Sequence, residues 1–285
     1  MSSVEITRRQ PGIAQVTMNR PKVFNAFDET MIAELDAAFA QLADAADARL
    51  IVLAGDGNHF STGADLKWMQ RASKATQEAN VADARRFAAM LARIGNCPKP
   101  TVARVQGSAL GGGVGLACAC DIAIAADNAR FSVSEVRFGI LPAVIGPYLV
   151  NALGKRQAMR LALTAARIGA AEALSIGLVQ QVAPLDRLDD AVDRVLEQLQ
   201  EGGPNAQREI KRLFAKLELG TVTPDVREFT AQTIGRVRAS DEAKEGFDAF
   251  FAKRPAAWVP AESQAERNTE PAPLTELPNM PRDQP

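Results

Sequence analysis

Three short segments of the chain contain residues whose types and spacing could do chemistry, and one of them offers a carboxylate. Glu135 follows the expected strand at 130–133 and is flanked by apolar residues. A carboxylate in an apolar wall has a raised pKa, so it can act as a general acid or base near neutral pH. The alternative is a surface glutamate that pairs with Arg137.

A glycine-rich segment offers backbone N–H groups instead of side chains. Residues 107–116 have the sequence GSALGGGVGL, in which three consecutive glycines are expected to open a helix. Free N–H groups and the positive end of the helix dipole would there favour developing negative charge. The segment lacks the third glycine of a dinucleotide fingerprint, the Gly-Lys ending of a phosphate loop and a G-x-S-x-G nucleophile. A tight turn that packs a helix on a sheet is the alternative.

The third segment, HFSTGADLK at 59–67, follows the continuous apolar run at 50–54. A turn of small residues at the carboxyl end of a buried strand leaves backbone N–H groups facing a crevice. An ordinary strand-to-helix turn with Asp65 as its N-cap is the alternative. We expect His59 to be structural.

Composition and charge exclude several classes of protein. The 285 residues include 47% hydrophobic and 24% charged residues, as in an ordinary globular protein. A net charge of −1 gives no general basic field for nucleic acid or an anionic membrane. Three cysteines and one histidine are too few for a disulfide framework or a Cys/His zinc site. We expect no metal, no signal peptide and a cytoplasmic location.

The elements that must position these segments alternate between strand and helix in the first half and are mostly helical afterwards. This alternation predicts an α/β core. Expected strands are 13–18, 50–54, 101–106, 122–126, 130–133 and 178–182. Expected helices are 29–42, 64–71, 78–94, 114–119, 143–153, 155–164, 170–176, 186–201, 204–219, 225–238 and 241–252. We divide the chain into a core at 1–200, a helical region at 201–259 and a disordered tail at 260–285.

The three segments together resemble the crotonase family, the enoyl-CoA hydratase/isomerase superfamily. The resemblance extends from NRPKVFN at 19–25 to FFAKRP at 250–255 and includes FSTGADL at 60–66, ALGGG at 109–113 and CDIAI at 120–124. It implies a spiral of strand-strand-helix turns followed by a helical trimerisation region. Trimers or hexamers are expected.

The resemblance also implies roles for individual residues. The N–H groups of Ala64 and Gly112 map to an oxyanion hole for a thioester carbonyl, and Glu135 maps to the acid/base. The other implied contacts to substrate or coenzyme A are Lys22, Val23, Phe24, Asp65, Leu66, Lys67, Gly111 and Pro142. A cation for a distal substrate carboxylate could come from Lys67, Arg71 or Arg137.

One departure from the family pattern concerns the second carboxylate of true hydratases. That position is Gly115 here, and the run PAVIG at 142–146 replaces a glycine-rich run, which predicts a bulkier pocket wall. The chain nevertheless looks most like bacterial 3-methylglutaconyl-CoA and carboxygeranoyl-CoA hydratases. It is therefore expected to hydrate a branched or carboxylated 2-enoyl-CoA, with acyl-CoA as its partner and no cofactor. A double-bond isomerase with one glutamate and a non-catalytic acyl-CoA binder are the alternatives.

Overall fold

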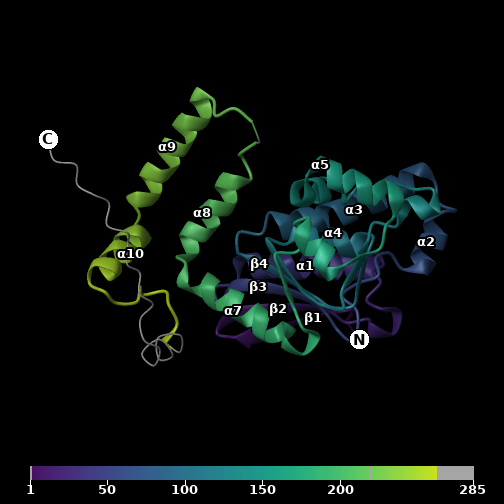
Figure 1. The fold of residues 1–285 in the computed structure, drawn as a ribbon, viewed down its shortest axis with the longest axis horizontal. Helices are drawn as coiled ribbons and strands as arrows, with labels where there is room; N and C mark the ends of the chain where they lie inside the picture. The colour runs from purple at the N-terminus through teal and green to yellow at the C-terminus, as the bar shows by residue number, and fades with distance from the viewer. Residues whose placement is uncertain (1, 219, 262–285) are drawn as a thin grey trace.

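The fold is built on a six-stranded sheet in a computed structural model that describes residues 2–218 and 220–261 (Figure 1). The spatial order is β1-β2-β3-β4-β6-β9, and every neighbouring pair is parallel except β1 and β2. The strands are β1 (Val4–Gln10), β2 (Gly12–Met18), β3 (Ala48–Gly55), β4 (Thr101–Val105), β6 (Ile122–Ala126) and β9 (Gln181–Ala183).

Ten α-helices are described. They are α1 (Glu29–Asp44), α2 (Leu66–Ala72), α3 (Gln77–Gly95), α4 (Gly112–Ala119), α5 (Gly146–Thr164), α6 (Ala170–Ser175), α7 (Leu188–Glu201), α8 (Pro204–Phe214), α9 (Pro224–Arg238) and α10 (Asp241–Phe251). Three short 3-10 helices are η1 (Pro21–Val23), η2 (Glu135–Phe138) and η3 (Leu185–Arg187). The predicted α/β class is confirmed.

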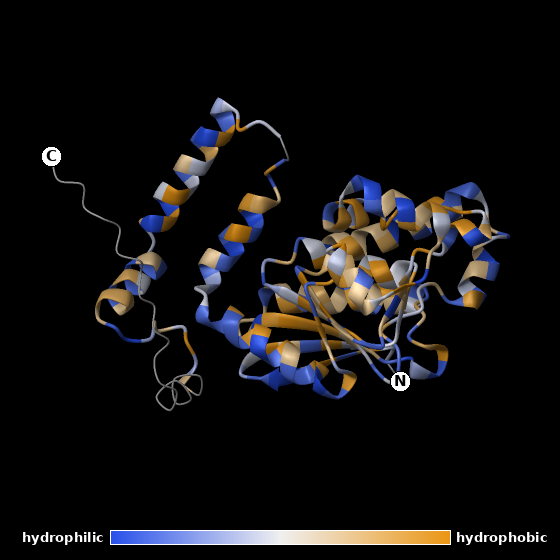
Figure 2. Cartoon of the chain, in the orientation of Figure 1, coloured by the Kyte–Doolittle hydropathy of each residue, from blue (hydrophilic) through white to orange (hydrophobic). Residues whose placement is uncertain are grey.

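Both faces of the sheet are covered, which explains why the central strands are almost continuously apolar (Figure 2). Ile51 and Leu53 of β3 face a core shared with α1, α3 and α4. Leu50 and Val52, which alternate with them, face a second core shared with α7. The sheet is therefore a rigid layer between two helical layers.

Three short strands form a second layer, in the order β5-β7-β8. They are β5 (Ser108–Leu110), β7 (Arg130–Ser132) and β8 (Ile168–Gly169), and β5 and β7 are parallel. Ser61 joins this layer through a parallel bridge to Ala109. The carboxyl ends of these parallel segments consequently meet at one edge.

The main differences from the sequence-based prediction are short elements. The strands β1, β5 and β8 were not expected, because two of them have only two or three residues and β1 is mostly polar. The helix predicted over 204–219 ends at Phe214. The expected break between 153 and 155 is present inside α5, where Gly154 has a non-helical φ of 70°.

The C-terminal helices extend away from the sheet. Figure 1 shows α8, α9 and α10 beyond the edge of the core, and α7 ends at Glu201. The predicted disordered tail lies, from residue 262 onward, outside the described residues. No helix within 2–218 and 220–261 is long and apolar enough to cross a membrane.

Candidate active site

The first candidate oxyanion donor is positioned by a parallel bridge. The N–H of Phe27 donates to the Gly63 carbonyl at 2.8 Å, and the N–H of Asp65 donates to the Phe27 carbonyl at 2.9 Å. This pattern leaves the N–H of Ala64, between them, facing away from Phe27. It donates to no acceptor within the described part of the chain.

The second candidate donor is the N–H of Gly112 in the first turn of α4. First-turn N–H groups have no acceptor inside their own helix, and this one has none among the other described residues. Gly111 makes the turn before it, with φ 50° and ψ −119°, a conformation that an L side chain rarely adopts.

The two donor segments are in direct backbone contact. A Cβ added to Gly63 would lie 2.6 Å from the Leu110 carbonyl oxygen and 3.3 Å from the nitrogen of Gly112. Only glycine at 63 permits that approach. The arrangement places the free N–H groups of Ala64 and Gly112 at the same edge, as an oxyanion hole requires.

Glu135 begins η2, three residues after β7, and its carboxylate lies over Gly111. A Cβ on Gly111 would be 3.2 Å from Oε1 of Glu135. Oε2 is buried and has no hydrogen-bond partner among the described residues. Burial raises the pKa of the Glu135 carboxyl above its ordinary value, so the group is suited to move a proton. Arg137, its partner in the alternative of a surface ion pair, instead donates to the Ala165 carbonyl at 3.0 Å.

The position of the second carboxylate is filled by Ile145. A Cβ on Gly115 would lie 2.2 Å from Cγ2 and 2.8 Å from Cβ of Ile145, which is 2% exposed at the N-cap of α5. A glutamate at 115 therefore has no room in this fold. In the run at 142–146, which was predicted to make the pocket wall bulkier, Ile145 is the residue that occupies the space beside Gly115.

The loop expected near the adenosine of coenzyme A is hydrogen-bonded to the segment that precedes Ala64. The carbonyl of Phe24 accepts from the N–H of Thr62 at 3.1 Å, and Ser61 Oγ donates to the Asn25 carbonyl at 2.8 Å. Lys22 and Val23 lie in η1 and are exposed, as is Phe24. The three residues are thus available to a ligand beside Ala64.

Asp65 caps a helix and forms an ion pair, so it has a structural role. Its carboxylate accepts from the N–H groups of Lys67 and Trp68 as the N-cap of α2, and it pairs with Arg20 at 3.0 Å. Arg20 also pairs with Asp28 at 3.1 Å, so one guanidinium joins the N-caps of α1 and α2. This ion pair holds Ala64 in place.

The remaining predicted substrate contacts differ in their exposure and in the contacts that they already make. Leu66 and Lys67 are exposed in the first turn of α2, and Gly111 lies beneath the Glu135 carboxylate. The half-buried Pro142 accepts from the N–H of Gly146 at 2.8 Å and so shapes the turn before α5. Arg71, a possible carboxylate partner, is paired with Glu29 at 2.7 Å.

Sequence reasoning missed Arg20, Asn25 and Ile145. The side chain of Asn25 is fully buried and donates to the carbonyls of Asp56 and His59, both at 2.8 Å. Its place beside the motif at 60–66 is visible only after folding. The signal for Ile145 was present in the run at 142–146, but the sequence could not pair it with Gly115.

A double-mutant cycle tests the contact between Gly115 and Ile145. Gly115→Ala should cost about 1–3 kcal/mol of unfolding free energy, because its methyl group overlaps Ile145. The same change in an Ile145→Ala background should cost far less, with a coupling of about 0.5–3 kcal/mol. Urea denaturation at one protein concentration measures all four proteins. Additive costs would contradict the contact.

Comparisons with known proteins agree with this geometry. A family model described as enoyl-CoA hydratase/isomerase matches residues 8–261. A Thermus thermophilus protein named as a candidate enoyl-CoA hydratase is 34% identical over 243 residues, which cover 85% of this chain and 96% of that protein.

Solved structures match over nearly the whole chain. An enoyl-CoA hydratase from Shewanella pealeana superposes with a TM-score of 0.86 and 38% identity, over 90% of this chain and 96% of its own. The Pseudomonas aeruginosa protein AtuE superposes with a TM-score of 0.86 and 38% identity, over 90% of this chain and 100% of its own. The predicted crotonase-like fold is therefore confirmed, and the chain belongs to the enoyl-CoA hydratase/isomerase family of enzymes.

Proposed function

We propose that the protein hydrates 2-enoyl-CoA thioesters, with a preference for branched or carboxylated acyl groups such as 3-methylglutaconyl. One observation carries the proposal. The N–H groups of Ala64 and Gly112 lie at the same edge as Glu135, whose Oε2 is buried, and none of these three groups has a hydrogen-bond partner among the described residues. A polarised thioester carbonyl and one proton-transferring carboxylate are what water addition needs.

The proposed steps use Glu135 twice. The N–H groups of Ala64 and Gly112 bind the thioester oxygen. The Glu135 carboxylate takes a proton from water as the water oxygen bonds to C3, and an enolate forms. The protonated carboxyl then gives that proton to C2, so one water is added and the carboxylate is restored. Removing one oxyanion donor from such a site typically costs about 10²- to 10³-fold in kcat.

The proposed reaction needs no metal or redox cofactor, because only a proton and water move. Coenzyme A enters as part of the substrate, and we assign its adenosine to the exposed loop at Lys22, Val23 and Phe24. Leu66 and Pro142 are the proposed contacts for the rest of the acyl-CoA. A cytoplasmic location remains a prediction, in keeping with three free cysteines.

The single carboxylate also supports a second function. With Ile145 in the place of a second acid, Glu135 could remove a proton from C2 of a 3-enoyl-CoA and return it to C4, which moves the double bond without adding water. A non-catalytic acyl-CoA binder is the third reading, in which Glu135 has no chemical role.

Product masses in ¹⁸O-labelled water separate these functions. The panel is crotonyl-CoA, 3-methylglutaconyl-CoA and a 3-enoyl-CoA. We expect a product heavier by one labelled water, formed fastest from 3-methylglutaconyl-CoA. An unchanged mass with a moved double bond would make the protein an isomerase. No turnover of any member, with tight binding, would support a binder and overturn hydration.

Glu135→Gln tests the acid/base role. The variant should lose about 10²- to 10⁴-fold in kcat with little change in KM, because the proton can no longer be moved. The acidic limb of the wild-type pH profile should have its midpoint above 4.5, since burial raises this pKa, and activity should fall as pH drops through it. The variant should lack that limb.

A stability measurement completes this test. An ionised, half-buried Glu135 costs stability as pH rises above its unfolded pKa, so Glu135→Gln should raise the Tm at neutral pH and not at low pH. Glu197→Gln, an exposed carboxyl on α7, is the matched control and should change nothing. Full activity of Glu135→Gln would refute the mechanism.

Lys67 is the proposed partner of a distal substrate carboxylate. Arg71 and Arg137 are already engaged, whereas the Lys67 amine has no partner among the described residues and follows Ala64 by three positions. Lys67→Met should raise KM for 3-methylglutaconyl-CoA at least about tenfold and leave crotonyl-CoA nearly unaffected, as expected for one charge-assisted contact. Lys74→Met is the control. Equal increases in KM for both substrates would indicate that Lys67 contacts the coenzyme A part, which the two substrates share.

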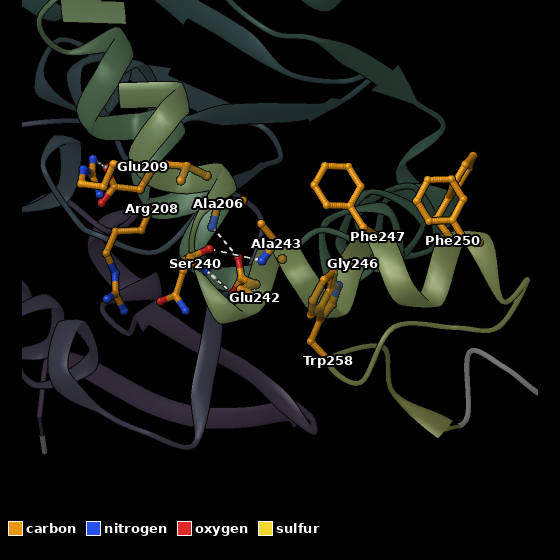
Figure 3. Close-up of a pocket in the computed structure, with 15 residues that line it drawn as sticks. Ala206, Arg208, Glu209, Ser240, Glu242, Ala243, Gly246, Phe247, Phe250 and Trp258 are labelled. Carbon is orange, nitrogen blue, oxygen red and sulfur yellow. Dashed lines mark hydrogen bonds and ion pairs between the residues drawn. The ribbon is translucent and has the colours of Figure 1, made fainter. Parts of the chain in front are cut away.

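Self-association is supported by exposed aromatic side chains in the C-terminal helices. Phe250 and Phe251 of α10 are 76% and 77% exposed. Figure 3 shows the rings of Phe247 and Phe250 projecting from the same side of α10, along a cavity of about 710 Å³ between α8, α9 and α10. Surfaces of this kind are usually covered by another protein. We propose a trimer or hexamer of this chain.

Light scattering with chromatography tests the assembly. The wild type should have the mass of a trimer or hexamer, and Phe250→Asp with Phe251→Asp should shift it toward monomer, because charges are unfavourable in an apolar interface. Circular dichroism of the variant should be unchanged. A monomeric wild type would contradict the proposal.

A further inference from the structure

A second cavity lies at the opposite edge of the large sheet from Glu135. It has a volume of about 510 Å³ and is bounded by the end of α1, the start of β3, the turn before β4 and the start of α8. The amino ends of β3 and β4 are at this edge, whereas the candidate active site follows carboxyl ends. Its lining includes four cationic side chains and one carboxylate: Arg49, Lys99, Arg208, Arg212 and Asp44.

Unpartnered buried atoms mark this cavity as they mark the active site. Three buried side-chain polar atoms in the described residues have no hydrogen-bond partner: Oε2 of Glu135, Nε of Arg49 and Nε of Arg208. The first belongs to the proposed catalytic group. The other two belong to residues that line this cavity, and of these Arg208 also borders the cavity between α8, α9 and α10. Buried donors without acceptors are rare in folded proteins, and an absent ligand is one cause.

The cations of the cavity are poorly neutralised. Arg49 donates to the carbonyls of Gln200 and Gly202, at 3.2 and 2.9 Å, and to that of Trp258. Lys99 is 8% exposed and donates to the carbonyls of Leu42 and Ala45. The hydrogen-bond acceptors of both side chains are therefore neutral carbonyls, and carboxylates act on them only without a hydrogen bond, Glu242 on Arg49 and Asp44 and Asp47 on Lys99.

Arg208 is the cation of this cavity whose guanidinium is available to a ligand. It makes no hydrogen bond or ion pair with any described residue, whereas Arg212 is paired with Glu209 at 3.0 Å. Figure 3 shows the Arg208 side chain directed away from Phe247 and Trp258. The nearby Glu242 carboxylate is occupied by the N–H groups of Asn205 and Ala206. Arg208 therefore lacks an anion.

We propose that this cavity binds an oxyanion, the phosphate or carboxylate group of a small molecule, between Arg208 and Arg49. Nε–H and Nη–H of a guanidinium form a fork that matches two oxygens of such a group. Lys99 adds a buried positive charge that stabilises the bound anion. The volume is in the range of small-molecule sites. This site is separate from the acyl-CoA site and does not depend on the proposed reaction.

Calorimetric titration of the full chain with inorganic phosphate and with citrate, at ionic strength fixed by chloride, tests the site. The wild type should bind at least one of them, and the tighter of the two identifies the group as phosphate or carboxylate. Arg208→Gln should weaken that binding at least about tenfold, the loss of one charge-assisted contact. Arg212→Gln, with its guanidinium already paired, should stay within about twofold of wild type.

Further measurements keep the test decisive. Arg208→Lys retains the charge without the fork and should bind with intermediate affinity, which covers the case that the glutamine variant does not fold. The KM for crotonyl-CoA should be unchanged in all variants. No heat with either anion in the wild type, or equal affinity in Arg208→Gln, would overturn the proposal. Phosphate that competes with acyl-CoA would place the anion in the active site and also overturn it.

Discussion

The close backbone approach of residues 61–64 to residues 109–113 is the constraint on which the candidate active site depends. A Cβ added to Gly63 would lie 2.6 Å from the Leu110 carbonyl oxygen, and a Cβ added to Gly113 would overlap the Ser61 carbonyl oxygen. This contact puts at one edge two N–H groups, of Ala64 and Gly112, that have no acceptor among the residues the structure describes. The ion pair of Arg20 with Asp65 and the buried Asn25 fix one segment, while β5 and β7 fix the other. Burial of both faces of the large sheet keeps these supports rigid.

The possible reactions follow from the groups at this edge of the fold, which are two N–H donors and one carboxylate. An oxyanion hole stabilises an enolate, which is shared by hydration and double-bond movement, and Glu135 can move a proton in either. Ile145 packs against Gly115, so a second carboxylate cannot stand at position 115. We attribute the choice of reaction to how substrate and water fit beside one glutamate. Lys67, in the first turn of α2 and without a partner in the part of the chain that the structure describes, would then select a carboxylated acyl group.

Much of this site could be predicted from the sequence, because its parts are local motifs. The segments at 59–67, 107–116 and 134–142 each follow a strand, and their order matched a known family, which the comparisons confirm. Contacts between distant residues could not be predicted. Ile145 and Gly115, or Arg208 and Arg49, become neighbours only when the fold is complete. Strands as short as β8 were missed because two residues carry no period.

Exchange of the C2 hydrogens of butyryl-CoA with deuterated water, followed by NMR, tests the central claim most directly. This saturated thioester cannot add water, so exchange requires only the oxyanion hole and one base. The account predicts exchange by the wild type and at least about 100-fold slower exchange by Glu135→Gln. Equal rates in the two proteins, or no exchange by the wild type while it turns over enoyl-CoA, would contradict the claim that Glu135 and the two N–H groups form one catalytic unit.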